Sequence, residues 1–483
     1  MRSLTAMALA LSAAIVAAVP AHATISLLAI GSLTGSSAGA GVDLSGLTYD
    51  LENGQTQNVL GGIGSGLAWA GGTTFYATPD RGPNALSYNA AVDNTTSYIS
   101  RFQTLDLQLT PSSGGALPFT LGATLTNTTL LSSSKPLIYG SGAGLGNDIN
   151  GNPLLPGNWV NGTPGTYYFT GRSDNFGAGG SGNPNDARFD PESIRVSNDG
   201  KSVFVSDEYG PYVRQFDAST GSLVRTYALP ADLDVANPGT TEDGEIAGNT
   251  AGRIANKGME GLALTPDGKT LVGIMQANLL QDPVGTLRIV TVDVATGATH
   301  EYLYQLTDGK GVSDIVAIDA THFLVDERDG KGLGDGSSAK AKSLYAIDLS
   351  GATDVTGADA AGIAAATPVT KSLKLDLVAA LKAAGYKASE IPAKIESLAF
   401  GEDVTDSLGH VLHTLYIAND NDFDTATSGQ NQFFVFGFTD ADLPGFTAQV
   451  FGGVPEPESW ALLIVGVGGI GVTLRLRRRQ QFA

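Results

Sequence analysis

The sequence predicts an all-β fold, and within that class a β-propeller of about six blades. Glycine accounts for 63 of the 483 residues, which suits many tight turns, and hydrophobic residues make up 42%, enough for a large core. Five hairpins of one plan recur along the chain, and repeated sets of strands are typical of propeller blades. Stretches with helical spacing are few. Five or seven blades are alternatives, and a pair of β-sandwiches is a rival architecture.

Each hairpin has a small or acidic opening residue, an apolar strand, a turn, a second strand and a closing group of Asp, Glu or Asn. In the clearest copy, Glu192 opens the first strand, a turn follows at residues 198–200, and Asp207 and Glu208 close the second strand. The other hairpins open at Ser65, Glu260, Ser313-Asp314 and Glu396. Because an antiparallel hairpin places the start of its first strand beside the end of its second, opener and closers should meet. A β-sandwich does not predict this repetition.

Two stretches depart from the hairpin pattern. Residues 111–185 are rich in Gly, Ser, Asn and Pro, which predicts long loops around a few strands. The gap between the first two hairpins leaves room for a further blade, and for this reason we expect six. Residues 373–384 have helical spacing and are followed by Gly385, which predicts a short helix before the last hairpin.

Both ends of the chain carry features of export. Residues 1–23 contain Arg2, an apolar stretch and Ala21-His22-Ala23, the pattern of a cleaved secretory signal peptide; an uncleaved membrane anchor is the alternative. Residues 454–483 contain Pro455-Glu456-Pro457, then one apolar helix, then a cluster of arginines. This order resembles the PEP-CTERM sorting tail of Gram-negative bacteria, and a permanent single-pass anchor is the alternative.

The resemblance of the tail implies export, processing by an exosortase near the Pro-Glu-Pro sequence, and release or attachment at the cell surface. Together with the signal peptide, it predicts that the body of the protein, residues 24–453, lies outside the cytoplasm. We expect the body at the cell envelope or extracellular surface, with the C-terminal helix as its only and transient contact with the membrane.

Charge and composition exclude several classes of function. The formal net charge is -20 at pH 7, which repels nucleic acid and anionic membranes and favours cations. The chain has no cysteine, so disulfides and thiolate metal sites are excluded. The sequence has no G-x-x-x-x-G-K-[ST] loop, which argues against a P-loop nucleotide site.

The acidic openers and closers predict one site at a mouth of the propeller channel, because the first strand of each blade lines that channel. Carboxylates so close together cannot all stay ionised and unpaired. They either bind a hard cation, pair with arginines, or accept hydrogen bonds from backbone amides and hold the blades together. Carboxylate and amide oxygens are the ligands of Ca²⁺, so we expect a calcium site. The expected ligands are Asp207, Glu208, Asp314, Asp326, Asn419, Asp420 and Asp422.

Catalysis and substrate binding are assigned to other residues at the same mouth. The expected catalytic residues are the opening glutamates Glu192, Glu260 and Glu396. The residues expected to bind the anionic group of a substrate are Arg81, Arg214, Lys257 and Arg328. A metal ion together with arginines could hold a phosphate ester for attack by a water molecule.

Six motifs fall in a fixed order along the chain and carry a family resemblance. They are Asp80-Arg81-Gly82-Pro83-Asn84, Asp190-Pro191-Glu192, Ser206-Asp207-Glu208-Tyr209-Gly210, Lys257-Gly258-Met259-Glu260-Gly261-Leu262, Lys394-Ile395-Glu396-Ser397-Leu398-Ala399 and Ile417-Ala418-Asn419-Asp420-Asn421-Asp422. These motifs resemble the phytase-like family, also described as "esterase-like activity of phytase". The resemblance covers about residues 64–438 and implies a β-propeller and a secreted hydrolase.

The resemblance and the acidic mouth together predict an exported, calcium-dependent hydrolase of phosphate or other esters. One alternative is a non-catalytic surface module that binds extracellular polysaccharide or protein, and its sign would be an acidic mouth with no arginine within reach of the metal. Another is a lactonase-like propeller, which would hold one deeply buried Ca²⁺ on the axis.

Overall fold

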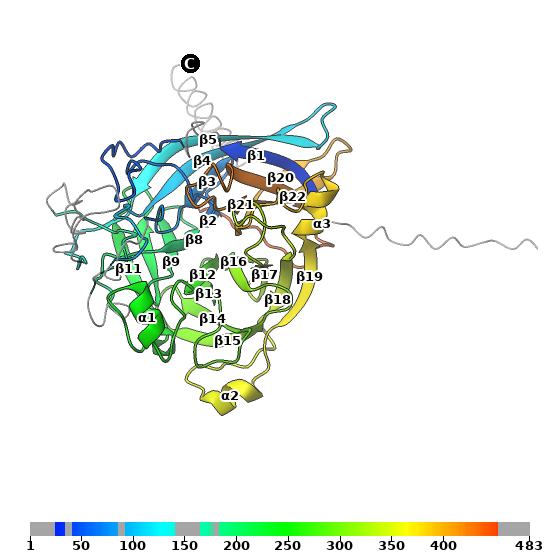
Figure 1. Ribbon diagram of the computed structural model, residues 1–483. Coiled ribbons are helices and arrows are strands. Elements are labelled where there is room, and N and C mark those ends of the chain that lie inside the picture. Colours follow the sequence, from blue (N-terminus) through cyan, green and yellow to red (C-terminus); the bar gives the residue numbers. More distant parts are fainter. Residues whose placement is uncertain are drawn as a thin grey trace, which may run out of the picture.

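The computed structural model describes residues 25–33, 41–85, 92–140, 165–174, 176 and 183–452, which form a five-bladed β-propeller (Figure 1). Each blade is a four-stranded antiparallel sheet. The innermost strands of neighbouring blades contact one another around the central axis, in the order β2, β8, β12, β16, β20 and back to β2. This ring confirms the propeller that the repeated hairpins predict.

The blades follow the order of the chain. Blade 1 consists of β2 (Gly66–Trp69), β3 (Thr74–Thr78), β4 (Arg101–Pro111) and β5 (Phe119–Leu130). Blade 2 consists of β8 (Pro191–Val196), β9 (Ser202–Asp207), β10 (Tyr212–Asp217) and β11 (Leu223–Ala228). Blade 3 consists of β12 (Met259–Leu264), β13 (Thr270–Met275), β14 (Thr286–Asp293) and β15 (Thr299–Gln305). Blade 4 consists of β16 (Gly311–Ala317), β17 (His322–Arg328), β18 (Lys342–Asp348) and β19 (Thr370–Asp376).

Blade 5 joins the two ends of the described chain and closes the ring. It consists of β20 (Ile395–Thr405), β21 (Val411–Asn419), β22 (Asn431–Phe438) and β1 (Ser26–Leu33). The first strand of the chain is therefore the outermost strand of the last blade, antiparallel to β22. Hydrogen bonds between β1 and β22 close the ring, because β1 leads along the chain into blade 1, whereas β20, β21 and β22 come from the opposite end of the chain.

The blade count of six was wrong, and the reason lies in the gap between the first two hairpins. The gap supplies the long outer strands β4 and β5 of blade 1 instead of a new blade. Besides β5 and isolated β-bridges, the described part of residues 111–185 contains one small sheet, made of β6 (Ser132–Ser133) and β7 (Tyr167–Tyr168). Long outer strands and long loops occupy as much sequence as a blade does, so length alone could not separate the two.

Helices are short and lie outside the ring of strands. They are η2 (Ala231–Leu233), α1 (Glu242–Gly248), α2 (Ala360–Ala365) and α3 (Leu377–Ala383). The predicted helix exists as α3, but it begins at Leu377, because the residues before it form the outer strand β19. Asp376 ends β19 and accepts a hydrogen bond from the backbone N–H of Ala379 at 2.9 Å, which caps the new helix.

Aromatic and aliphatic side chains fill the spaces between blades. Phe75 of β3 packs on Tyr416 of β21, with ring centroids 4.5 Å apart, and so joins blade 1 to blade 5. Phe189, just before blade 2, packs on Phe169 and Phe216. Closely packed interfaces of this kind fix the positions of the inner strands, and therefore of the side chains at the channel mouth.

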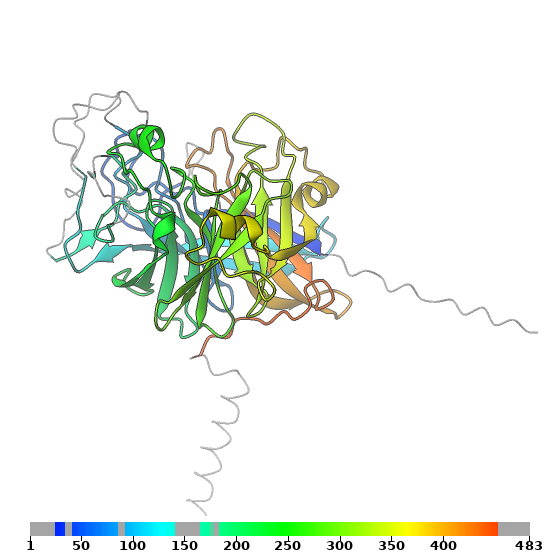
Figure 2. The same cartoon turned by 90° about the horizontal axis from the view of Figure 1, so that it is seen from below.

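The last described segment, residues 440–452, crosses the underside of the propeller (Figure 2). Gln449 donates to the carbonyl of Val196 at 2.7 Å, and the N–H of Gly452 donates to the carbonyl of Asn198 at 2.6 Å. Asn198 lies in the turn of hairpin β8–β9, at the end opposite Glu192. The segment therefore covers the end of the channel opposite the acidic openers.

The predicted signal peptide and sorting tail, residues 1–23 and 454–483, lie outside the described residues. Within the described part of the chain, no helix has both the length and the apolar character needed to cross a membrane.

Candidate functional site

A cavity of about 390 Å³ opens at one mouth of the channel, and all five blades contribute to its walls. Among the described residues, its walls contain six carboxylates and five basic side chains, in addition to amides and glycines. The carboxylates are Asp80, Glu192, Glu208, Glu260, Glu396 and Asp422. The basic residues are Arg81, Lys257, Lys310, Arg328 and Lys394.

β-Bulges aim three opening glutamates into this cavity. In β8, β12 and β20 the register with the next strand shifts across Glu192, Glu260 and Glu396 respectively. A bulge adds one residue to one strand and turns that residue out of the regular alternation. The openers can therefore face the cavity while the residue after each of them faces the neighbouring blades.

Among the carboxylates of the site, that of Glu192 has the fewest hydrogen-bond and ion-pair partners. It is only 8% exposed, lines the cavity, and makes no hydrogen bond or ion pair with any residue that the structure describes. Burial raises the pKa of Glu192 well above its usual value, and the nearby Glu260, Asp190 and Glu208 raise it further. An ionised form of this side chain requires a positive charge that the described protein does not supply.

Glu208 and Glu260 extend the acidic side of the cavity. Glu208 accepts a hydrogen bond from the backbone N–H of Gly258 at 3.2 Å, and burial, followed by the charge of Asp190, raises its pKa to about 7. One oxygen of Glu260 accepts from Gln276 at 2.8 Å, and the other is buried without a hydrogen-bond partner among the described residues. Burial and the charge of Glu208 raise the pKa of Glu260 well above its usual value.

Arg328 is the cation of the opposite wall. It donates to a carboxylate oxygen of Glu396 and to the hydroxyl of Ser313, and it lies 3.9 Å from Glu260. Burial raises the pKa of Glu396 even though Lys394 and Arg328 lower it. Glu396 therefore holds Arg328 in place at the edge of the cavity.

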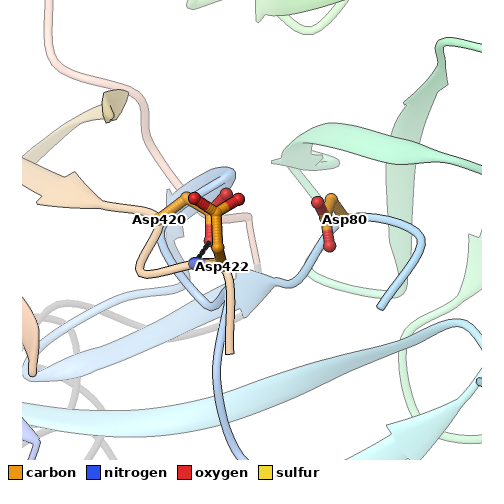
Figure 3. A group of neighbouring side chains, drawn as sticks. All are labelled: Asp80, Asp420 and Asp422. Atoms are coloured by element: carbon orange, nitrogen blue, oxygen red, sulfur yellow. Dashed lines mark hydrogen bonds between the residues drawn. The ribbon is translucent and has the colours of Figure 1, made fainter. Parts of the chain in front are cut away.

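A second group of acids lies where blades 1 and 5 meet. Asp420 and Asp422 follow β21 on one loop, and Asp80 faces them from the loop after β3 (Figure 3). Lys394 forms ion pairs with Asp420, at 2.8 Å, and with Asp422. Although burial opposes it, this lysine holds the pKa of Asp420 below its usual value.

Backbone strain accompanies this loop and the loop before blade 3. Asp422 and Asn256 both line the cavity and both have positive φ, 52° and 54°, in the left-handed region that residues other than glycine seldom adopt. Residues held in such conformations are concentrated at functional sites, where the surrounding structure holds them in place.

Two sets of three carboxylates have the spacing that a metal ion requires. One set is Asp80, Asp420 and Asp422, and the other is Asp190, Glu192 and Glu208. In each set one oxygen per residue lies within 4.8 Å of the others. Oxygen-only ligands with such separations fit Ca²⁺, whose bonds to oxygen are about 2.3–2.6 Å long. The unpartnered carboxylate of Glu192 is the independent sign that a cation fits this cavity.

The structure does not bring Asp314 to the cavity, and the expectation that it faces the mouth was wrong. It lies on the channel axis beneath the cavity, where both of its oxygens accept from Arg195 at 2.8–2.9 Å. The hydroxyl of Ser193 and the backbone N–H of Leu398 also donate to it, at 2.9 and 2.8 Å. Ser313, one residue earlier, occupies the place of the opening glutamates. Asp314 therefore plugs the channel and ties blades 2, 4 and 5 together.

Asp207 and Arg214 also lie outside the cavity walls, although both were expected at the site. Asp207 accepts from the backbone N–H groups of Asp190 and Tyr209, at 3.2 and 3.0 Å, and so shapes the loop after β9. Arg214 lies 3.7 Å from Asp207 and its guanidinium stacks over the ring of Phe169. Burial raises the pKa of Asp207 to about 6 despite Arg214. Both side chains are buried outside the cavity walls and contact neighbouring parts of the fold.

Asp326 and Asn419 are likewise not part of the cavity walls. Asn419 accepts from the backbone N–H of Gln432 at 2.6 Å and fixes the start of the acidic loop. Asp326 is fully buried, and neither of its oxygens has a hydrogen-bond partner among the residues with described positions. Burial raises the pKa of Asp326 to about 7.

The structure adds residues to which the sequence analysis assigned no role. Asp80, Lys310 and Lys394 all line the cavity. Asp80 closes the first hairpin as Asp420 closes the last, so an alignment of the hairpins contained the signal for it. Lys394 precedes the opener Glu396 by two residues, a position that the hairpin plan does not mark.

The fold and the site define a five-bladed propeller with an acidic cavity at one end of its channel. Residues 58–423 match the model of the Phytase-like family, described as "Esterase-like activity of phytase", and the chain belongs to this family. An "Uncharacterized secreted protein" of Arthroderma benhamiae is 32% identical over 257 residues, 47% of this chain. The match spans 46% of the length of that relative.

Two solved structures show distant similarity. A periplasmic gluconolactonase of Pseudomonas aeruginosa matches with 13% identity and a TM-score of 0.29, over 84% of this chain and 94% of that chain. A putative 6-phosphogluconolactonase from Bacteroides uniformis matches with 13% identity and a TM-score of 0.29, over 76% of this chain and 83% of that chain. TM-scores of this size support no argument about function.

Proposed function

We propose that this protein is an exported, calcium-dependent hydrolase of phosphate or other small esters that acts in the cavity at the channel mouth. The observation that carries the proposal is the buried, unpartnered carboxylate of Glu192 in a cavity that also contains arginines. A buried charge without a partner is costly to keep unless a ligand compensates for it. Such a group in a concave site is a strong candidate for binding or catalysis.

The side chains around Glu192 can divide the work of ester hydrolysis. Glu260 has one free buried oxygen and a raised pKa, so it can accept a proton from an attacking water molecule. Arg328, held by Glu396, can stabilise negative charge that develops on the substrate. Arg81 and Lys257 lie in the same walls and can hold an anionic group.

Calcium fits the donor set of the cavity, which consists of carboxylate oxygens with additional amides. Glu192 and Glu208 would hold it, and when bound it would polarise an ester oxygen and acidify a water ligand. It would also reduce the negative potential that otherwise repels an anionic substrate. The chain itself would orient an anionic substrate through the basic residues of the cavity walls.

Two observations favour hydrolysis over the alternatives. A purely binding module was expected to have no arginine within reach of the metal, whereas Arg81 is paired with Asp190, which lies beside Glu192 and Glu208. A lactonase-like site was expected to hold a cation deep on the axis, and the ion pair of Arg195 with Asp314 occupies that position. Polysaccharide binding and lactone hydrolysis are therefore less well supported than the proposed function, and the experiment below tests for both.

Export and surface retention belong to the same proposal. The pattern of residues 1–23 and the name of the secreted relative support export. The order of features in residues 454–483 supports processing by an exosortase. Mass spectrometry of the mature protein from the native host checks both: we expect a new N-terminus after Ala23 and loss of the arginine-rich end. Intact termini in the mature protein would contradict this part of the proposal.

The decisive experiment measures turnover of phytate, aryl phosphates, aryl carboxylic esters and a lactone by the purified full chain. We expect hydrolysis of at least one ester in calcium and none after treatment with EDTA. Glu192→Gln and Glu260→Gln should lower turnover by about 10²–10⁴-fold. Glu390→Gln, which alters an exposed ion pair with Lys387, serves as the matched control and should retain full turnover. Calcium-independent binding of polysaccharide without any turnover would replace hydrolysis with the binding function.

A further inference from the structure

We propose that the cavity binds one divalent cation and not two, at Asp190, Glu192 and Glu208, because Lys394 already supplies the positive charge of the second carboxylate group. The inference rests on the proposed function only in that both place a cation in the cavity. The inference places that cation at Asp190, Glu192 and Glu208. Lys394 then acts as a fixed positive charge that prevents a metal ion from binding at Asp80, Asp420 and Asp422.

The first group lacks a sufficient cation of its own. Glu192 is more than nine-tenths buried and has no partner in the described parts of the chain. Glu208 accepts only the neutral N–H of Gly258. Asp190 is paired with Arg81, at 3.2 Å, but its other oxygen accepts a backbone N–H, at 2.8 Å, and both contacts leave lone pairs free. Two of the three carboxylates therefore lack any cation at ion-pair distance.

Glu260 makes this wall more acidic still. One of its oxygens is buried without a hydrogen-bond partner among the described residues, and its charge is close enough to Glu192 for the two carboxylates to repel each other. Arg81 is paired with Asp190 of the first group, and Arg328, which is bound to Glu396, lies 3.9 Å from Glu260. Among the described residues, Glu192 and Glu208 have no cation at ion-pair distance, so uncompensated negative charge is concentrated in blade 2, where a divalent ion gains most.

The second group is already neutralised in part and is held in that state. Lys394 is paired with Asp420 and Asp422, which leaves only Asp80 without a cation at ion-pair distance. The backbone N–H of Asp420 donates to the carbonyl of Lys394 at 3.1 Å, so the two residues are joined through both backbone and side chain. A metal ion at this group would have to displace an ammonium from two carboxylates.

The ammonium of Lys394 is held between two carboxylates. It forms ion pairs with Asp420, at 2.8 Å, and with Asp422. A second cation would therefore meet a fixed positive charge a few ångströms away, and this repulsion is strong where water is largely excluded. The same three carboxylates without the lysine would form a second binding site.

Isothermal titration of the EDTA-stripped full chain with CaCl₂ tests the inference. We expect one site in the unmodified protein and none in Glu192→Gln. Asp422→Asn should keep one site, because its group does not hold the ion. Lys394→Met should gain a second site, whereas Lys394→Arg, which keeps the charge, should retain one. Circular dichroism melting of each variant establishes that it is folded before its sites are counted.

Each outcome decides the matter. Two sites in the unmodified chain, loss of the site in Asp422→Asn, or a single site in folded Lys394→Met would overturn the inference. If Lys394→Met does not fold, the contrast between Glu192→Gln and Asp422→Asn still decides where the ion binds. If the protein hydrolyses an ester but binds two ions, the proposed function holds and the inference fails. If it binds one ion and the variants behave as expected but no ester is hydrolysed, the inference holds and the proposed function fails.

Discussion

At the scale of single residues, the ion pair of Arg195 and Asp314 determines how deep the cavity can extend. Arg195 also donates to the backbone carbonyls of Leu67, at 2.7 Å, and Ile315, at 2.8 Å, so this one guanidinium contacts blades 1 and 4 from blade 2. The channel is therefore closed by a polar cluster with its hydrogen bonds nearly complete. Such clusters are costly to disrupt from one side only.

We predict that Asp314→Ala lowers the free energy of unfolding by about 3–5 kcal/mol, because it leaves a buried guanidinium without its carboxylate. Urea denaturation followed by circular dichroism measures the change. The double variant Arg195→Met/Asp314→Leu should be more stable than Asp314→Ala, since it removes both charges together. A single variant as stable as the unmodified chain would show that the pair does not close the channel.

Asp314 also illustrates where the sequence could not predict the site. Glu192, Glu260 and Glu396 line the cavity, and the sequence indicated this position because each of them opens an inner strand. Asp314 opens a strand too, but the extra residue of the bulge in that strand is Ser313. In a strand, a shift of one residue moves a side chain to the other face. No residue type in the sequence marks which of two neighbours is the extra residue.

At the scale of elements, the loop from β21 to β22 depends on a close approach by the chain before β2. A Cβ atom added at Gly64 would lie 2.0 Å from the backbone oxygen of Asn419. Gly62 donates its N–H to the side chain of Asn421 at 2.9 Å. The acidic loop therefore keeps its shape because glycines allow two backbones to touch.

We predict that Gly64→Ala lowers the free energy of unfolding by about 1–3 kcal/mol or more, because the added methyl group overlaps a backbone atom that cannot move freely. Gly351→Ala is the matched control, since a Cβ atom at that glycine meets nothing within 4 Å. Thermal melting compares the two. Equal melting temperatures for both variants would show that the two backbones can separate without cost.

The strand β1 closes the ring of blades through its pairing with β22. Leu28 in this strand is buried, and we predict that Leu28→Ala lowers the free energy of unfolding by about 2–5 kcal/mol. Leu373→Ala is the control, because Leu373 also lies in an outermost strand, β19, but is 55% exposed. It should change stability by less than about 0.5 kcal/mol. Similar losses in both variants, measured in urea, would argue against closure through β1.

At the scale of the whole molecule, stability should depend on pH through His413 on the underside. His413 bonds to Asp403 at 2.7 Å and Asp440 at 3.1 Å, and its ring packs on Phe446. Burial lowers its pKa, but the two aspartates outweigh burial, so the pKa of His413 lies above its usual value. A raised pKa means that the folded state binds the proton more tightly than the unfolded state.

The stabilisation by His413 is therefore complete below the unfolded pKa, about 6.5, and is lost as the pH rises through the folded pKa. We predict that His413→Gln costs more stability near about pH 5.5 than near about pH 9, by a few tenths to about 1 kcal/mol. Urea midpoints at the two pH values measure it. A cost that is independent of pH, or larger at high pH, would contradict this assignment.

The sequence predicted most of the overall architecture, because each repeated hairpin contains the innermost strand of one blade and its neighbour. All five predicted hairpins are present, as β2–β3, β8–β9, β12–β13, β16–β17 and β20–β21. The number of blades could not be predicted, because the outer strands have a weaker sequence pattern than the hairpins. In addition, β1, the outer partner of β22, comes from the opposite end of the chain. The role of Lys394 could not be predicted for a similar reason, because its partners, Asp420 and Asp422, are distant in sequence.

The bond from Gly452 to Asn198 fixes the side from which the rest of the chain departs. Since Asn198 lies at the far end of the channel from the cavity, anything linked after residue 452 leaves from the back of the propeller. A layer of molecules attached to a cell, a resin or a sensor chip by this end would present every cavity outward. Coupling through the C-terminus should therefore leave the cavity open to solutes, even at high surface density.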